Sequence, residues 1–115
     1  MIVYGIKNCN TVKKSLDWLK ANEIEFEFHD YKSKGITEAK LKEWIKQVGW
    51  ESLVNKKGTT FKQLDDAAKA KVKDAASAIK LMMEKTSVIK RPLIEDGGKV
   101  LALGFNEAEY ESVLL

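Results

Sequence analysis

The chain has 115 residues with 44% hydrophobic and 32% charged side chains, and its formal net charge at pH 7 is +3. This length supports one domain, the mixed composition excludes a low-complexity chain, and so small a charge gives no reason to expect nucleic-acid binding. No apolar run approaches the roughly 18 residues that a membrane span needs, and the N-terminus lacks the features of a signal peptide, so we expect a cytoplasmic protein without a membrane anchor.

The first predicted elements are a strand, a helix and a second strand. Residues 2–4 are β-branched or aromatic, which predicts a short buried strand. Apolar side chains recur at helical spacing from about residue 11 to residue 22, and residues 24–28 alternate strictly between apolar and polar, as a strand does. Short links between these elements predict a parallel βαβ unit. Cys9 then lies past the carboxyl end of the first strand, at the start of the helix.

The middle of the chain is predicted to be helical after a loop at residues 31–35. Thr37 is a predicted N-cap of the first helix. Residues 53–61 predict a basic loop that contains a turn. The alanine-rich residues 65–85 predict a helix divided in two, with Asp74 as the cap of the second piece.

The last predicted elements are two strands and a helix. Residues 88–94 lead into the turn signal Asp-Gly-Gly at 96–98, and residues 100–103 form the returning antiparallel strand. Asn106 is the predicted cap of the final helix. The complete order is β-α-β, a helical insert at about residues 36–86, and β-β-α, which predicts an α/β fold.

This order is the topology of thioredoxin-like domains, and the sequence resembles the arsenate reductase family of the glutaredoxin-coupled type. Within that family it is similar to the YffB-like branch, which is related to the Spx proteins. The resemblance is carried by the segments VYGIKNCNTVKKSLDWL, SLVNKKGTTFKQL, IKRPLI and GGKVLALGFNEAEYESVLL. It spans essentially the whole chain and implies one thioredoxin-like domain over residues 1–115, with a mixed four-stranded sheet.

Cys9, the only cysteine, is the predicted nucleophile. A free thiol has a pKa of about 8.5 and is only about 3% ionised at pH 7, whereas the thiolate is the reactive form. A helix N-terminus stabilises this anion by roughly 0.3–1 kcal/mol, and a cation within about 4–6 Å lowers the pKa further. The candidate cations are Lys7, Lys13, Lys14 and Arg91. The alternative is a small buried cysteine without chemistry.

The resemblance favours Arg91 among these cations, because thioredoxin-like folds bring the segment before the third strand against the cysteine loop. It also implies that Pro92, the only proline, follows a cis peptide bond beside the reactive cysteine. Arg91 would then present its planar guanidinium to a carboxylate or an oxyanion. The alternative is a proline in an edge strand next to a solvated arginine.

Further substrate-binding residues are predicted at two places. Asn55 and Lys56 begin a loop with lysines, a glycine and two threonines, which suits anion binding, and the family places this insert at the border of the active cleft. The alternative is an exposed polar loop. At the start of the first helix, the amides near Asn10 and Thr11 are predicted to meet a carboxylate of glutathione.

The sequence differs from arsenate reductases of this type at several positions. Of their three arginines only Arg91 is present, because Asn55 and a residue near Leu103 occupy the other two places. Gly5 stands where those enzymes have a histidine four residues before the cysteine. Val12 stands where a CxxC pair would have its second cysteine, so a dithiol mechanism within one chain is impossible. These differences predict a weak site for arsenate and a monothiol cycle.

The resemblance therefore implies a thiol oxidoreductase that is coupled to glutathione or glutaredoxin and acts through Cys9. We expect no bound cofactor or metal, with glutathione as the co-substrate. We also expect a small oxidised thiol or an oxyanion as the substrate, and a monomeric protein. One alternative is a Spx-like regulatory binding protein on the same fold, whose role would survive Cys9→Ser. The other is an arsenate reductase proper, which would turn over arsenate.

Overall fold

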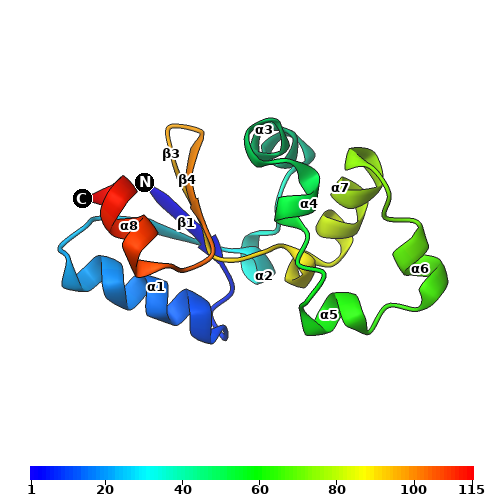
Figure 1. Cartoon of the computed structure of the whole chain (residues 1–115), viewed down its shortest axis with the longest axis horizontal. Helices are drawn as coiled ribbons and strands as arrows, with labels where there is room; N and C mark the ends of the chain where they lie inside the picture. Colours follow the sequence, from blue (N-terminus) through cyan, green and yellow to red (C-terminus); the bar gives the residue numbers. More distant parts are fainter. The chain divides into compact units, whose positions relative to one another are not determined.

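The computed structural model describes all 115 residues, and the chain divides into two compact units (Figure 1). The first unit combines residues 1–34 with residues 91–115, and the second comprises residues 35–90. The helical insert predicted at about residues 36–86 lies inside the second unit. None of the helices combines the length and the apolar character that crossing a membrane requires.

The first unit is built on a mixed four-stranded sheet with the strand order β2-β1-β3-β4. The strands are β1 (Ile2–Gly5), β2 (Glu27–Asp30), β3 (Leu93–Asp96) and β4 (Lys99–Leu103). Strand β1 pairs in parallel with β2 and antiparallel with β3, and β3 pairs antiparallel with β4. The predicted α/β class and the mixed four-stranded sheet are thereby confirmed.

The second strand begins at Glu27 rather than at residue 24. The chain leaves the first helix through Glu23, whose φ of 58° is positive, and the N–H of Ile24 donates back to the carbonyl of Leu19 at 3.0 Å. Ile24 and Phe26 then pack against the core before sheet pairing starts. Their alternation comes from this packing and not from a ladder of strand hydrogen bonds.

One face of the sheet is covered by helices α1 (Asn10–Ala21) and α8 (Glu107–Leu114), which Figure 1 shows beside the strands. The core on this face consists of Val3, Leu19, Ile94, Ala102 and Tyr110. All five are nearly or fully buried. Val3, Leu19 and Ile94 each contribute roughly 1.5–3 kcal/mol when the side chain leaves water. This core holds α1 in place, and with it the helix start that follows Cys9.

The opposite face of the sheet carries polar and aromatic side chains. Side chains alternate along a strand, so Tyr4 and Glu95 point away from the face of Val3 and Ile94. Tyr31 follows β2 directly and opens a short helix, α2 (Tyr31–Lys34), where the sequence predicted a loop. The helical turn forms because an Asp30 side-chain oxygen accepts a hydrogen bond from the N–H of Lys32 at 3.0 Å.

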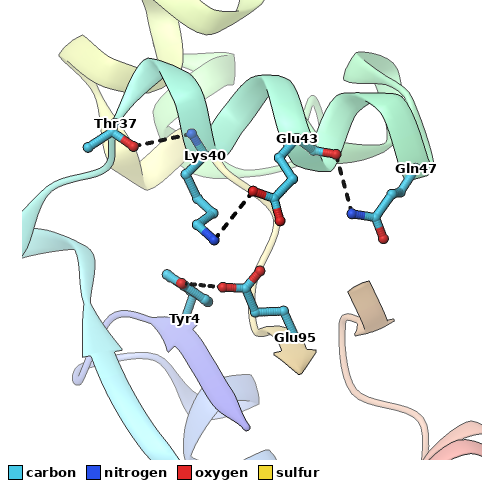
Figure 2. A network of polar contacts seen from close by, with 6 residues as sticks. All are labelled: Tyr4, Thr37, Lys40, Glu43, Gln47 and Glu95. Atoms are coloured by element: carbon cyan, nitrogen blue, oxygen red, sulfur yellow. Dashed lines mark hydrogen bonds and ion pairs between the residues drawn. The ribbon is translucent and has the colours of Figure 1, made fainter. Parts of the chain in front are cut away.

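The second unit is helical. It contains α3 (Glu38–Val48), α4 (Trp50–Leu53), α5 (Thr59–Lys62), α6 (Asp66–Ala70), α7 (Ala75–Glu84) and the 3-10 turn η1 (Thr86–Val88). Helices α3 and α4 and the turn η1 pack on α7. Thr37 caps α3 through the N–H of Lys40, the first of several polar contacts along this helix in Figure 2, and Asp74 caps α7, as predicted.

The stretch predicted as a loop at residues 53–61 is more ordered than the sequence suggests. It begins at the last residue of α4 and includes the start of α5. Between them, Val54 forms an isolated antiparallel bridge with Ile89, and the N–H of Asn55 donates to the carbonyl of Val88 at 2.7 Å. The partner segment lies more than 30 residues away, so the local composition gave no signal for this pairing.

Candidate active site

Cys9 occupies the N-cap position of α1, directly after the loop that follows β1. Its backbone is extended, with φ −123° and ψ 121°, and its carbonyl accepts the first helical hydrogen bond from the N–H of Lys13 at 3.0 Å. The side chain is half-exposed. The first turn of α1 contains no acidic residue, so nothing there offsets the positive end of the helix dipole. The sulfur is therefore accessible and faces a positive potential.

The pKa of the Cys9 thiol is lower than its ordinary value. Partial burial opposes this by disfavouring the anion, but three groups outweigh that effect. The backbone N–H of Val12 faces the sulfur, the Arg91 guanidinium acts on it by hydrogen bonding and by its charge, and the N–H of Thr11 contributes less. Arg91 is thus the cation that meets the thiol, as the resemblance implied.

The Arg91–Pro92 segment enters β3 from the same end of the sheet. The peptide bond between the two residues is cis, Pro92 is buried, and Arg91 is half-buried. The Pro92 carbonyl accepts a hydrogen bond from the N–H of Gly104 at 2.7 Å, which ties this segment to the end of β4. The β3–β4 pairing thereby fixes the backbone from which Arg91 reaches Cys9.

A group of buried residues near Arg91 was not singled out by sequence reasoning. Tyr4 and Glu95 are connected by a hydrogen bond from the tyrosine hydroxyl to the carboxylate (Figure 2). The Tyr31 ring lies 6.1 Å from the Tyr4 ring and 5.9 Å from the His29 ring, between ring centroids. One signal for this group was present in the sequence, because a glutamate occupies an inward-facing position of the apolar strand LIED.

The two units divide the predicted site residues between them. Cys9, Arg91 and Pro92 belong to the first unit, as do Asn10 and Thr11, which are exposed at the start of α1. The other two predicted binding residues, Asn55 and Lys56, belong to the second unit. Within that unit the Lys56 ammonium lies 5.4 Å from the centroid of the Trp50 ring, a cation–π contact. Their part in a substrate site remains a prediction.

These features define a class of protein. The sheet order is β2-β1-β3-β4, a cysteine stands at the N-terminus of the first helix, and a cis-proline follows Arg91 just before the third strand. This combination is that of a thioredoxin-like fold. The model of the ArsC family matches residues 4–113, so the chain belongs to the ArsC family.

Relatives and solved structures support this assignment. An uncharacterized protein of Haemophilus influenzae is 46% identical over 110 residues, which cover 96% of this chain and 95% of that protein. The global transcriptional regulator Spx of Streptococcus pyogenes serotype M3 is 26% identical over 110 residues, which cover 93% of this chain and 79% of that protein.

Among solved structures, one described as the YFFB protein superposes with a TM-score of 0.92 at 43% identity, covering 99% of this chain and 98% of the other. An arsenate reductase (ArsC) related protein from Brucella melitensis superposes with a TM-score of 0.77 at 45% identity. The match covers 96% of this chain and 91% of the other. The family thus includes proteins named as reductase relatives and proteins named as regulators.

Proposed function

We propose that this protein is a thiol oxidoreductase that is coupled to glutathione or glutaredoxin and uses Cys9 as its single nucleophile. The observation that carries the proposal is the environment of the sulfur. A half-exposed thiol at a helix N-terminus, with Arg91 beside it, has a lowered pKa. A cysteine retained only for packing needs neither the exposure nor the cation, whereas a nucleophile needs both.

The proposed cycle uses one thiol. The Cys9 thiolate attacks the glutathione sulfur of a mixed disulfide between glutathione and a substrate thiol. The substrate sulfur leaves as a thiolate that takes a proton from water, and a disulfide forms between Cys9 and glutathione. A second thiolate, from glutathione or glutaredoxin, then attacks that bond, becomes part of an oxidised disulfide and restores the Cys9 thiolate. Over the cycle, the substrate sulfur is reduced to a thiol, the single donor thiol is oxidised, and the glutathione that was bound to the substrate leaves in the new disulfide.

Arg91 has two tasks in this proposal. Before the reaction it stabilises the Cys9 thiolate, and during binding its guanidinium offers paired donors to a carboxylate. Glutathione carries two carboxylates, and the exposed helix start at Asn10 and Thr11 offers amides for the second one. Asn55 and Lys56, which belong to the second unit, are themselves proposed as anion-binding residues.

Arsenate is a weaker candidate for the substrate. Arsenate carries one to two negative charges at neutral pH and needs several positive partners. The arsenate reductases that this sequence resembles usually hold three arginines around the cysteine. Here one of the corresponding positions is Asn55 and another lies near Leu103, a half-buried residue of β4. A single guanidinium suits one carboxylate better than a dianion. We therefore place the activity with thiol substrates.

The homology to Spx supports a second candidate, a regulatory binding protein on the same fold. The two functions differ in their need for sulfur. A partner-binding role survives Cys9→Ser, because serine keeps the size and the helix position. The oxidoreductase loses all thiol exchange in that variant, which can be measured as the reduction of a glutathionylated peptide.

The test of the proposed function is the rate of iodoacetamide alkylation of Cys9 across pH, in the wild type and in Arg91→Ala. We expect an apparent pKa below 8.5 in the wild type and a rise of about one unit in Arg91→Ala, since a nearby cation shifts a pKa by one to three units. Arg91→Lys serves as the matched control that keeps the charge. A pKa of about 8.5 in both the wild type and Arg91→Ala contradicts the proposal.

A further inference from the structure

Gly5, the last residue of β1, is a glycine that space requires rather than backbone conformation. It is not among the residues with a positive φ. A Cβ atom at this position would lie 2.8 Å from Cγ2 and 3.2 Å from Cγ1 of Val12, and 3.5 Å from Cε1 of Phe28. Non-bonded carbon atoms pack at about 3.5–4.0 Å, so the approach of Val12 leaves no room for a side chain. Gly5 thus makes the space that Val12 fills.

The Val12 side chain has little freedom to move away from this contact. Val12 is the third residue of α1 and is 1% exposed. A β-branched residue in a helix has one strongly preferred rotamer, so its side chain cannot turn aside without strain. The contact with Gly5 therefore fixes the distance between the end of β1 and the backbone of the first turn of α1.

The same turn of α1 provides the amides that act on Cys9. The N–H groups of its first three residues precede the first helical hydrogen bond, which Lys13 donates to the Cys9 carbonyl, and have no acceptor within the helix. The third of them, that of Val12, is one that typically faces an N-cap side chain. The Cys9 side chain forms no capping hydrogen bond, so the amides act through their partial charges, whose effect falls off with distance.

The strand under Val12 is held more firmly than the helix start above it. Strand β1 is paired with β2 on one side and with β3 on the other. The first turn of α1 is joined to β1 only through residues 6–9, which lie outside the sheet. Any overlap between position 5 and Val12 would therefore displace the first turn of α1 and not the strand.

We propose that Val12 is a positioning residue for Cys9, whose side chain, seated against Gly5, holds the first turn of α1 where its amides face the sulfur. This inference rests on the proposed function and deepens it. Position 12 is where a CxxC pair would have its second cysteine, and here it provides a fixed backbone amide in place of a second thiol. The lowered pKa of Cys9 agrees with this, because the Val12 N–H is the strongest single interaction that lowers it.

The experiment is a double-mutant cycle of Gly5→Ala, Val12→Ala and the combined variant. Gly5→Ala creates the overlap, and Val12→Ala removes both methyl groups that the new Cβ would meet. For each variant we measure the pH profile of Cys9 alkylation by iodoacetamide and the midpoint of thermal unfolding. Leu19→Ala is the matched control, because it also truncates a buried apolar side chain of α1 but lies two turns further along the helix.

We expect Gly5→Ala to raise the Cys9 pKa by about half a unit, which lowers the thiolate fraction about threefold well below the pKa. Val12→Ala raises this pKa by less, since the first turn is released but not displaced. In the combined variant the Cys9 pKa returns toward that of the wild type, although two residues are changed. Leu19→Ala lowers the unfolding midpoint and leaves the Cys9 pKa unchanged.

Three outcomes overturn the inference. The first is that Gly5→Ala and Val12→Ala lower the unfolding midpoint and keep the wild-type pKa of Cys9. The second is a combined variant whose Cys9 pKa is as high as that of Gly5→Ala. If Gly5→Ala does not fold, a wild-type Cys9 pKa in Val12→Ala has the same meaning.

Arg91→Ala separates these failures from a failure of the proposed function. If Arg91→Ala raises the Cys9 pKa while the variants at positions 5 and 12 do not, only the inference fails and the proposed function stands. If the pKa is about 8.5 in both the wild type and Arg91→Ala, the proposed function fails and the inference fails with it.

Discussion

Two tyrosine hydroxyls on opposite faces of the sheet in the first unit, those of Tyr110 and Tyr31, are buried in opposite ways. On the face covered by α1 and α8, the Tyr110 hydroxyl donates to the Gly104 carbonyl and also bonds with the Ser15 hydroxyl. On the opposite face, the Tyr31 hydroxyl has no such partner. The first arrangement stabilises the fold. The second adds no hydrogen bond to the fold and lies in the electrostatic field of Arg91, which also acts on the Cys9 sulfur.

The two faces therefore differ in how completely their buried polar groups are paired. The face under α1 and α8 is a core in which apolar groups pack and the buried polar groups find partners. The other face carries the buried carboxylate of Glu95 and the unpaired Tyr31 hydroxyl. Local departures from ideal packing are commonly found beside functional groups, where a stable scaffold elsewhere compensates for them.

The largest expected effect is that of a cavity in the face of the sheet that α1 and α8 cover. Leu19→Ala removes a fully buried side chain from the core beneath α1, so we expect a loss of about 2–5 kcal/mol in the free energy of unfolding. The pKa of Cys9 should remain unchanged under conditions where the variant is folded. Urea unfolding and alkylation measure the two effects, with the exposed Lys20→Ala on the same helix as control. A shifted Cys9 pKa in Leu19→Ala would contradict this prediction, because it would show that packing around Leu19 also affects the thiol.

A smaller effect is expected at the end of the chain. Asn106 caps α8 by accepting a hydrogen bond from the N–H of Glu109 at 2.9 Å. Asn106→Ala should destabilise the protein by about 0.5–2 kcal/mol, whereas Asn106→Asp, which keeps the acceptor, should retain most of the stability. Thermal unfolding of both variants checks this. Equal losses in the two would mean that the side-chain cap contributes little to α8.

The smallest expected effect is a pH dependence of stability that comes from the Cys9 thiol. The pKa of Cys9 is lower in the folded protein than in the unfolded chain, so the folded state binds the proton less tightly. Its contribution to stability is absent below the folded pKa, grows as the pH rises, and is complete above the unfolded value of about 8.5. The difference in unfolding free energy between the wild type and Cys9→Ser should therefore increase with pH across that window. Urea unfolding at several pH values measures it, and a constant difference contradicts the lowered pKa.

Local features of the sequence were predicted well. Thr37, Asp74 and Asn106 each cap the helix that the sequence assigned to them, because a cap is decided by hydrogen bonds within three residues. The β-α-β start and the position of Cys9 before a helix follow for the same reason, since hydrophobic periodicity is a local property. At β2 and at Val54, pairing with a distant segment decides which residues become extended. There the structure differs from the boundaries that the sequence predicted.

Local sequence patterns thus predicted the four strands, the longer helices, their order and a cysteine at a helix start. The resemblance pointed to Arg91, but only the tertiary structure decided what surrounds it. The hydrogen bond between Tyr4 and Glu95 joins residues 91 positions apart, and Tyr31 and Arg91 are separated by the whole helical unit. A hydrogen bond such as that of Tyr4 and Glu95 depends on strand register and on which face of the sheet a side chain occupies. Neither is encoded in a short window of sequence, because a shift of one residue moves every side chain to the other face.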